Sequence, residues 1–75
     1  MTDKTLDVKG LNCPLPILRA KKTLKDMPPG AVLEVLATDP GSLEDFPAFC
    51  KSTSDELVEA GADGGVYRFL IRRAR

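Results

Sequence analysis

The chain passes from its first predicted strand into its first predicted helix within Gly10-Leu11-Asn12-Cys13-Pro14-Leu15-Pro16-Ile17-Leu18-Arg19. Proline suits the first turn of a helix and no interior position, so the two prolines indicate that the helix begins at about Pro14. Cys13 is then at or beside the N-cap, where unpaired N–H groups and the helix dipole favour an anion. The pattern predicts a thiol pKa below that of an ordinary cysteine, with the N–H groups of Leu15 and Ile17 as candidates to face the sulfur.

The segments on either side of this stretch predict a strand–helix–strand unit. Residues 6–9 alternate apolar and polar side chains, as in a half-buried strand, and residues 31–38 are apolar on nearly both sides, as in an interior strand. A helix is predicted between them, from residue 14 to about residue 27. Such a unit favours a right-handed crossover between parallel strands. The apolar face of the helix is expected to hold Ile17, Ala20, Leu24 and Met27, with Leu18 beside them.

A second helix is predicted after the turn at residues 39–41. It is expected to begin at Leu43, or nearer Asp45 because Pro47 sits awkwardly inside a helix. Residues 42–45 also have the spacing of a capping box. An apolar face of Leu43, Phe46, Phe49 and Cys50 is expected to pack inward, with Cys50 as a small buried hydrophobic residue.

The last third of the chain predicts an antiparallel pair of strands. Residues 66–72 alternate as a strand, with Tyr67, Phe69 and Ile71 facing one way, and residues 56–60 are its expected partner across a glycine-rich turn at residues 61–65. The element order is therefore βαβαββ. We predict an α/β (α+β) two-layer sandwich, in which a four-stranded mixed sheet carries two helices on one face.

Composition limits the function classes. The 75 residues are enough for a single domain over residues 1–75, and 43% hydrophobic with 29% charged residues is typical of a globular protein. Eleven basic and eleven acidic residues cancel, so we expect no direct binding to nucleic acid and no membrane association. With a polar N-terminal stretch and no apolar run of bilayer-spanning length, a cytoplasmic location is expected.

The chain has two cysteines and no histidine. A Cys–His nucleophile pair and a Cys/His zinc site are therefore excluded, and two cysteines are too few for a thiolate-only zinc site. We expect no metal and no organic cofactor. The cysteines lack Cys-x-x-Cys spacing, which argues against a thioredoxin-like disulfide exchanger. A single exposed thiol at Cys13 suits carrying a group better than exchanging electrons.

Several short segments match one protein family in order and spacing. They are Leu6-Asp7, Gly10-Leu11-Asn12-Cys13-Pro14-Leu15-Pro16, Pro29-Gly30, Asp39-Pro40-Gly41, Asp45-Phe46-Pro47-Ala48-Phe49-Cys50 and Tyr67-Arg68-Phe69-Leu70-Ile71-Arg72. With the Cys-Pro-x-Pro signature among them, these segments resemble the TusA/SirA family of small sulfur-carrier proteins over nearly the whole chain. That family has a two-layer βαβαββ sandwich, which agrees with the element order predicted from the residues.

The resemblance implies a role for Cys13. It would accept a sulfane sulfur, as a persulfide, from a cysteine desulfurase or another persulfide donor and relay it to an acceptor protein. Gly10, Asn12, Pro14 and Pro16 would shape this site. The resemblance leaves open whether the sulfur serves tRNA thiolation, molybdenum-cofactor metabolism or sulfur oxidation. It also leaves open whether such a sulfurtransferase-type carrier, with its covalent cysteine persulfide, counts as an enzyme.

Three basic residues of the first helix, Arg19, Lys22 and Lys25, lie opposite its apolar face. They could form a docking surface for acidic partners, although solvated basic residues in the second half of a helix also complement its dipole. An alternative function is a regulatory or protein-interaction module of the same fold that carries no sulfur. RNA binding is disfavoured by the zero net charge and by the few aromatic residues, one tyrosine and three phenylalanines.

Overall fold

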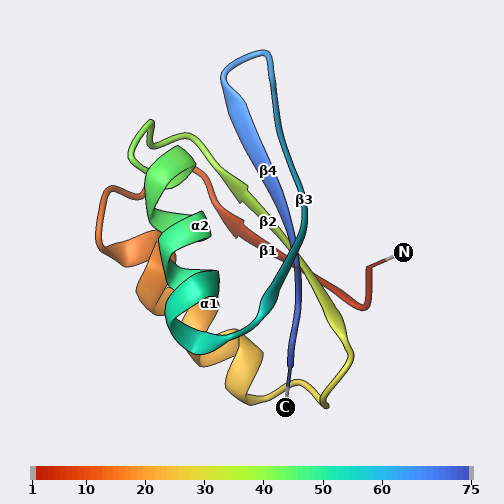
Figure 1. Cartoon of the computed structure of the whole chain (residues 1–75). Helices are drawn as coiled ribbons and strands as arrows, with labels where there is room; N and C mark the ends of the chain where they lie inside the picture. The colour runs from red at the N-terminus through yellow and green to blue at the C-terminus, as the bar shows by residue number, and fades with distance from the viewer. Residues whose placement is uncertain (1, 75) are drawn as a thin grey trace.

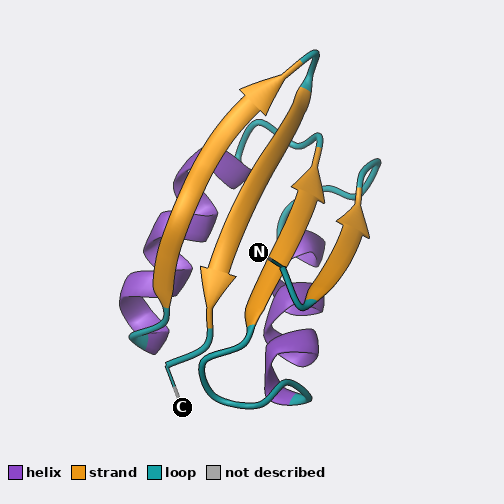
Figure 2. Cartoon of the chain, turned by 90° about the vertical axis from the view of Figure 1, so that its right-hand side faces the viewer, coloured by secondary structure: helices purple, strands orange, loops and turns teal. Residues whose placement is uncertain are grey.

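The computed structural model describes residues 2–74. Its elements are β1 (Lys4–Val8), α1 (Leu15–Lys25), β2 (Val32–Ala37), α2 (Ser42–Thr53), β3 (Glu56–Asp63) and β4 (Val66–Arg72). Both helices cover one face of a four-stranded sheet, and the other face is open (Figures 1 and 2). The predicted order βαβαββ and the predicted two-layer sandwich are confirmed.

The sheet has the strand order β1-β2-β4-β3. β1 and β2 are parallel, with Leu6 opposite Val35, whereas β4 is antiparallel to both of its neighbours and places Phe69 opposite Val35. The carboxyl ends of parallel strands meet at one edge of a sheet, which is where α/β proteins commonly place their sites. The loop after β1 and the loop after β2 therefore lie next to each other.

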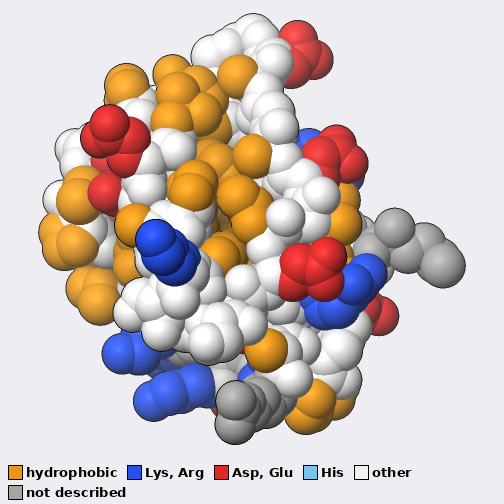
Figure 3. Space-filling model, viewed as in Figure 1, with side chains coloured by type: hydrophobic (Ala, Val, Ile, Leu, Met, Phe, Trp, Pro, Cys, Tyr) orange, Lys and Arg blue, Asp and Glu red, His pale blue; other side chains and the backbone are white. Residues whose placement is uncertain are grey.

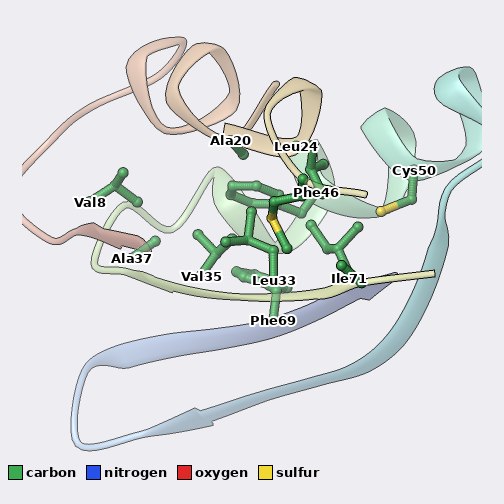
Figure 4. Packing of buried hydrophobic residues seen from close by; sticks show 12 residues of the cluster. Val8, Ala20, Leu24, Leu33, Val35, Ala37, Phe46, Cys50, Phe69 and Ile71 are labelled. Carbon is green, nitrogen blue, oxygen red and sulfur yellow. The ribbon is translucent and has the colours of Figure 1, made fainter. Parts of the chain in front are cut away.

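The core lies between the sheet and the two helices. Phe46 of α2 stacks on Phe69 of β4, with ring centroids 4.8 Å apart and both side chains 0% exposed. Figure 4 shows Phe46 between the helices and the strands, with Leu24 of α1 beside it. Cys50 of α2 belongs to the same apolar cluster, which confirms its prediction as a buried hydrophobic residue.

Two leucines are exposed that were predicted to lie on a buried helix face, in the case of Leu43, or beside one, in the case of Leu18. Leu18 of α1 is 54% exposed, because the buried residues Ala20 and Leu24 lie on the other side of the helix. Leu43 of α2 is 47% exposed, since the buried positions of α2 follow a four-residue spacing from Ser42 and Leu43 lies beside that stripe.

α2 begins at Ser42, earlier than predicted, and the predicted capping box is absent. Gly41 is the N-cap and no side chain caps the helix; the Asp39 carboxylate instead accepts a hydrogen bond from the N–H of Gly41, at 3.3 Å. Pro47 lies inside the helix and removes one backbone hydrogen bond, to the carbonyl of Leu43. Both of these residues are exposed, so water can take the place of the missing donor.

The β3–β4 hairpin is longer than predicted. Gly64 and Gly65 have φ values of 58° and 85°, and a two-residue turn with positive φ at both positions is enough to reverse the chain. Residues 61–63, predicted as part of the turn, therefore continue β3. The β4 boundaries and the start of β3 are those predicted, and the boundaries of β1, α1 and β2 differ from the predicted ones by one or two residues.

Within residues 2–74, neither helix has the length and apolar character needed to span a bilayer.

Candidate functional site

Cys13 lies in the exposed loop between β1 and α1, the orange loop at the left of Figure 1. α1 begins at Leu15 with Pro14 as its N-cap, so Cys13 is one residue outside the cap. The Cys13–Pro14 peptide bond is cis. The thiol is thus close to the helix start, as predicted, but outside the helix itself.

The loop after β2 holds the Cys13 loop through two side chains. The hydroxyl oxygen of Thr38 accepts a hydrogen bond from the N–H of Gly10, and Oδ2 of Asp39 accepts one from the N–H of Cys13, both at 2.9 Å. Gly10 has a φ of 83°, a backbone conformation that favours glycine. These two hydrogen bonds fix the backbone of the loop that carries the Cys13 side chain.

The predicted site-shaping residues all lie in or beside this loop. The carbonyl of Asn12 accepts a hydrogen bond from the N–H of Leu15 at 2.9 Å, and the carbonyl of Pro14 accepts one from Leu18 at 3.1 Å. Pro16 is buried in the first turn of α1. The N–H of Leu15 is therefore used within the turn, and the prediction that it faces the sulfur is wrong.

Two carboxylates act on the thiol. A hydrogen bond to Asp45, partial desolvation, and then the negative charges of Asp45 and Asp39 raise the pKa of Cys13 above its ordinary value. The prediction of a lowered pKa is wrong, because it considered only the helix start and not the two carboxylates from elsewhere in the fold, which disfavour the thiolate. Asp39 is 26 residues away along the chain. Its position directly after β2, the parallel neighbour of β1, was the signal that could have located it.

Cys50 differs from Cys13 in its exposure to solvent. It is 3% exposed and faces the core from α2 (Figure 4). Burial, followed by the charge of Asp55, raises the pKa of Cys50 to about 11. At neutral pH this thiol is protonated and inaccessible. Cys13 is the thiol that a partner can reach.

The solvent side of α1 carries an apolar part near Cys13 and a basic part beyond it. Leu15 and Leu18 are 45% and 54% exposed, and the predicted docking residues Arg19, Lys22 and Lys25 are exposed farther along the helix. Figure 3 shows basic side chains at the lower end of the molecule, where α1 ends. The sequence prediction missed the apolar part, although residues 15, 18, 22 and 25 share one side of a helix. We call Leu15, Leu18, Arg19, Lys22 and Lys25 together the docking face.

A hollow of about 470 Å³ lies on the open face of the sheet, away from the docking face. Its lining comes from β2, β3 and β4, and no residue of the Cys13 loop contributes. Residues 2–74 also contain no group of three or more Cys, Asp and Glu side chains arranged to hold a metal ion. The chemistry that these residues support is therefore centred on one exposed thiol with two carboxylates beside it.

Comparisons with known proteins agree with the family indicated by the sequence segments. The family model for sulfurtransferase TusA matches residues 4–73. A sulfur carrier protein TusA of Allochromatium vinosum is 60% identical over 72 residues, which cover 96% of this chain and 95% of the relative. A putative sulfur carrier protein of Neisseria meningitidis is 53% identical over 96% of this chain and 97% of its own length. The crystal structure of a SirA-like protein from Desulfitobacterium hafniense matches with a TM-score of 0.83 and 28% identity, over 96% of this chain and 99% of that one.

Proposed function

This chain belongs to the TusA family of sulfur carrier proteins, and we propose that Cys13 is the residue on which it carries sulfur, as a persulfide. A sulfur carrier works between a donor and an acceptor of sulfur. The observation that supports Cys13 is its exposure on an anchored loop, whereas Cys50 lies in the core. Gly10, Asn12 and Pro14 support the same proposal, because their backbone groups shape that loop.

The transfer step is an exchange between a thiol and a persulfide. Sγ of Cys13 attacks the outer sulfur of the donor persulfide, a new S–S bond forms, and the S–S bond of the donor breaks. The donor cysteine leaves and takes up the proton that Cys13 gives up. The exchange balances without an added oxidant or reductant. An acceptor nucleophile then attacks the outer sulfur on Cys13, which restores the Cys13 thiol.

The donor in this proposal is a cysteine desulfurase or another persulfidated protein, and the carrier works in the cytoplasm. Exposed leucines beside the thiol support a macromolecular partner, because the centre of a protein–protein interface is apolar and its rim is polar. The two leucines of the docking face would lie near the reacting sulfur, and its three basic residues would lie at the rim.

Peptide mass analysis tests the proposal directly. The reduced protein is incubated with a cysteine desulfurase and cysteine. The masses of the peptides that contain Cys13 and Cys50 are then measured before and after treatment with a reductant. We expect one reductant-labile sulfur on the Cys13 peptide and none on the Cys50 peptide, because only the first thiol is accessible. Sulfur on Cys50, or no sulfur from several competent donors, would contradict the proposal.

Charge reversal tests the docking face. Lys22→Glu is expected to raise the KM for the carrier in a donor assay severalfold, because an acidic partner surface would be repelled. The effect should shrink as salt screens the charges. Lys4→Glu makes the same charge change on β1 and is the matched control. Equal KM values for the two variants would show that the basic part of the docking face does not contact the donor.

A further inference from the structure

We propose that the open face of the sheet is a second docking surface, where the hollow between β2, β3 and β4 receives a basic side chain, arginine or lysine, of a partner protein. The inference rests on the proposed function in one respect, since a sulfur carrier has at least two partners, a donor and an acceptor. It adds a place for a partner that is bound while the docking face on α1 is occupied.

The hollow exists because β3 has no side chain at Gly61. Gly61 lies opposite Arg68 in the sheet register and contributes to the lining. A Cβ built at this position would meet no atom within 4 Å, and its φ value is outside the left-handed region, so the backbone does not require glycine here. Glycine inside a strand weakens the strand and often marks a place that a ligand or another backbone approaches closely. The position is therefore suited to receive a group from outside the chain.

The walls of the hollow are partly apolar. Leu36 of β2 and Val66 of β4 are half-buried, and Ala62 of β3 is exposed. The volume of about 470 Å³ lies within the range of pockets that hold small molecules, about 300–1,000 Å³. Arginine and lysine lay their aliphatic stems along apolar surface and keep the charged end in a polar environment. The lining thus suits the stem of a long basic side chain.

Arg68, the one cation that lines the hollow among residues 2–74, is paired on two sides. Its guanidinium donates a hydrogen bond to Oε2 of Glu34 and another, at 3.3 Å, to Oε2 of Glu59. The hydrogen bond from Arg68 lowers the pKa of Glu34, so this carboxylate is ionised at neutral pH. Two carboxylates therefore share one guanidinium.

Asp63 adds a further negative charge to the lining. It lies at the end of β3 and takes part in no ion pair within the residues that the structure describes. Arg72, near the other end of the hairpin, is paired with Glu56 at 2.7 Å and is not available to Asp63. The carboxylates at the hollow therefore outnumber its single guanidinium, and the surplus negative charge attracts a cation.

The two faces of the molecule carry opposite charge, although the net charge is zero. The docking face presents Arg19, Lys22 and Lys25 on α1, whereas the hollow lies on the far side of the sheet from both helices (Figure 2). An acidic partner is attracted to the first face and repelled by the second, and the reverse holds for a basic partner. Partners of opposite charge can then bind together without competing for one surface.

Peptide binding measured by NMR tests the inference without any sulfur donor. The probe is an acetylated and amidated pentapeptide with two arginines, and its counterpart with two glutamates is the control ligand. The arginine peptide is expected to shift the backbone amide signals of residues 59–68 in a saturable way, and less strongly as salt is added. Saturable shifts on α1 alone, no saturable shift, or equal shifts with the glutamate peptide would overturn the proposal.

Gly61→Leu separates the shape of the hollow from its charge. Leucine fills the empty space without changing any charge, so the affinity for the arginine peptide is expected to fall severalfold. Ala60→Leu is the matched control, because it adds the same side chain to the neighbouring exposed residue of β3, opposite Phe69 and on the other face. Circular dichroism checks that both variants are folded. Equal affinities for Gly61→Leu and the parent protein would overturn the proposal.

Asp63→Lys tests the charge of the hollow and is independent of the glycine substitution. It is expected to weaken binding of the arginine peptide severalfold. Glu44→Lys makes the same charge change on an exposed residue of α2, in the helix layer, and should have little effect. An effect of Glu44→Lys as large as that of Asp63→Lys would mean that only the net charge matters, which would overturn the role of the hollow.

Two further measurements identify the occupant. Gly61→Leu is expected to accept sulfur on Cys13 at the parent rate, because no residue of the Cys13 loop lines the hollow, and slower loading would overturn the assignment to a second partner. Sedimentation at low salt should show a monomer, and a dimer that Gly61→Leu abolishes would make a second copy of this chain the occupant instead. Absence of loading in every protein, the parent included, would contradict the role of Cys13 and leave the peptide result standing.

Discussion

Cys13→Ser is expected to abolish sulfur loading completely and to leave the fold unchanged. A serine hydroxyl cannot form the S–S bond on which the carrier proposal depends, and Cys13 is exposed, so the change disturbs no packing. The measurement is the intact mass after incubation with a cysteine desulfurase and cysteine, together with sulfur delivery to an acceptor. Unfolding in urea checks that stability is unchanged.

Cys50→Ala is the control for this experiment. It removes the other thiol from the core and is expected to lower stability by about 1 kcal/mol, without affecting sulfur loading on Cys13. The alternative function, an interaction module that carries no sulfur, makes the opposite prediction for Cys13→Ser, namely full function. Retention of the cellular function by Cys13→Ser, without any sulfur loading, would therefore favour the interaction module.

Phe46→Ala is expected to cause the largest loss of stability of any single substitution considered for this chain. Phe46 is 0% exposed and stacks on Phe69 with ring centroids 4.8 Å apart, so alanine would leave a cavity between α2 and the sheet. Such truncations cost about 3–5 kcal/mol, and a domain of this size has only about 5–15 kcal/mol in total. Urea unfolding should show a lower midpoint with an unchanged slope.

Leu43→Ala is the control on the same helix. Leu43 is 47% exposed, so its truncation should change the free energy of unfolding by no more than about 0.5 kcal/mol. A cost for Phe46→Ala of less than about 1 kcal/mol would mean that the Phe46–Phe69 stack is not central to the core.

Local patterns were sufficient for the order of the elements and for the position of the exposed thiol beside the start of α1. The alternation of side chains along the chain predicts β4 at Val66–Arg72, with the boundaries that the structure has. This prediction succeeds because the period of a strand depends on neighbouring residues alone. The two prolines after Cys13 locate the start of α1 within one residue. Local patterns were less reliable for the side of a helix that is buried, as Leu18 and Leu43 show, since burial depends on what packs against the helix.

The fold class, the family and the exposed cysteine were predictable from the amino-acid sequence, because turn residues, hydrophobic periods and motif spacing act over short stretches of chain. The direction of the pKa shift of that cysteine depends instead on residues that are distant along the chain. Hydrogen bonds and charge interactions depend on distance through space, and the parallel pairing of β1 with β2 brings Asp39 to the N–H of Cys13. Asp45 and Asp39 raise the pKa of Cys13, which is the reverse of the shift that the helix start alone would predict.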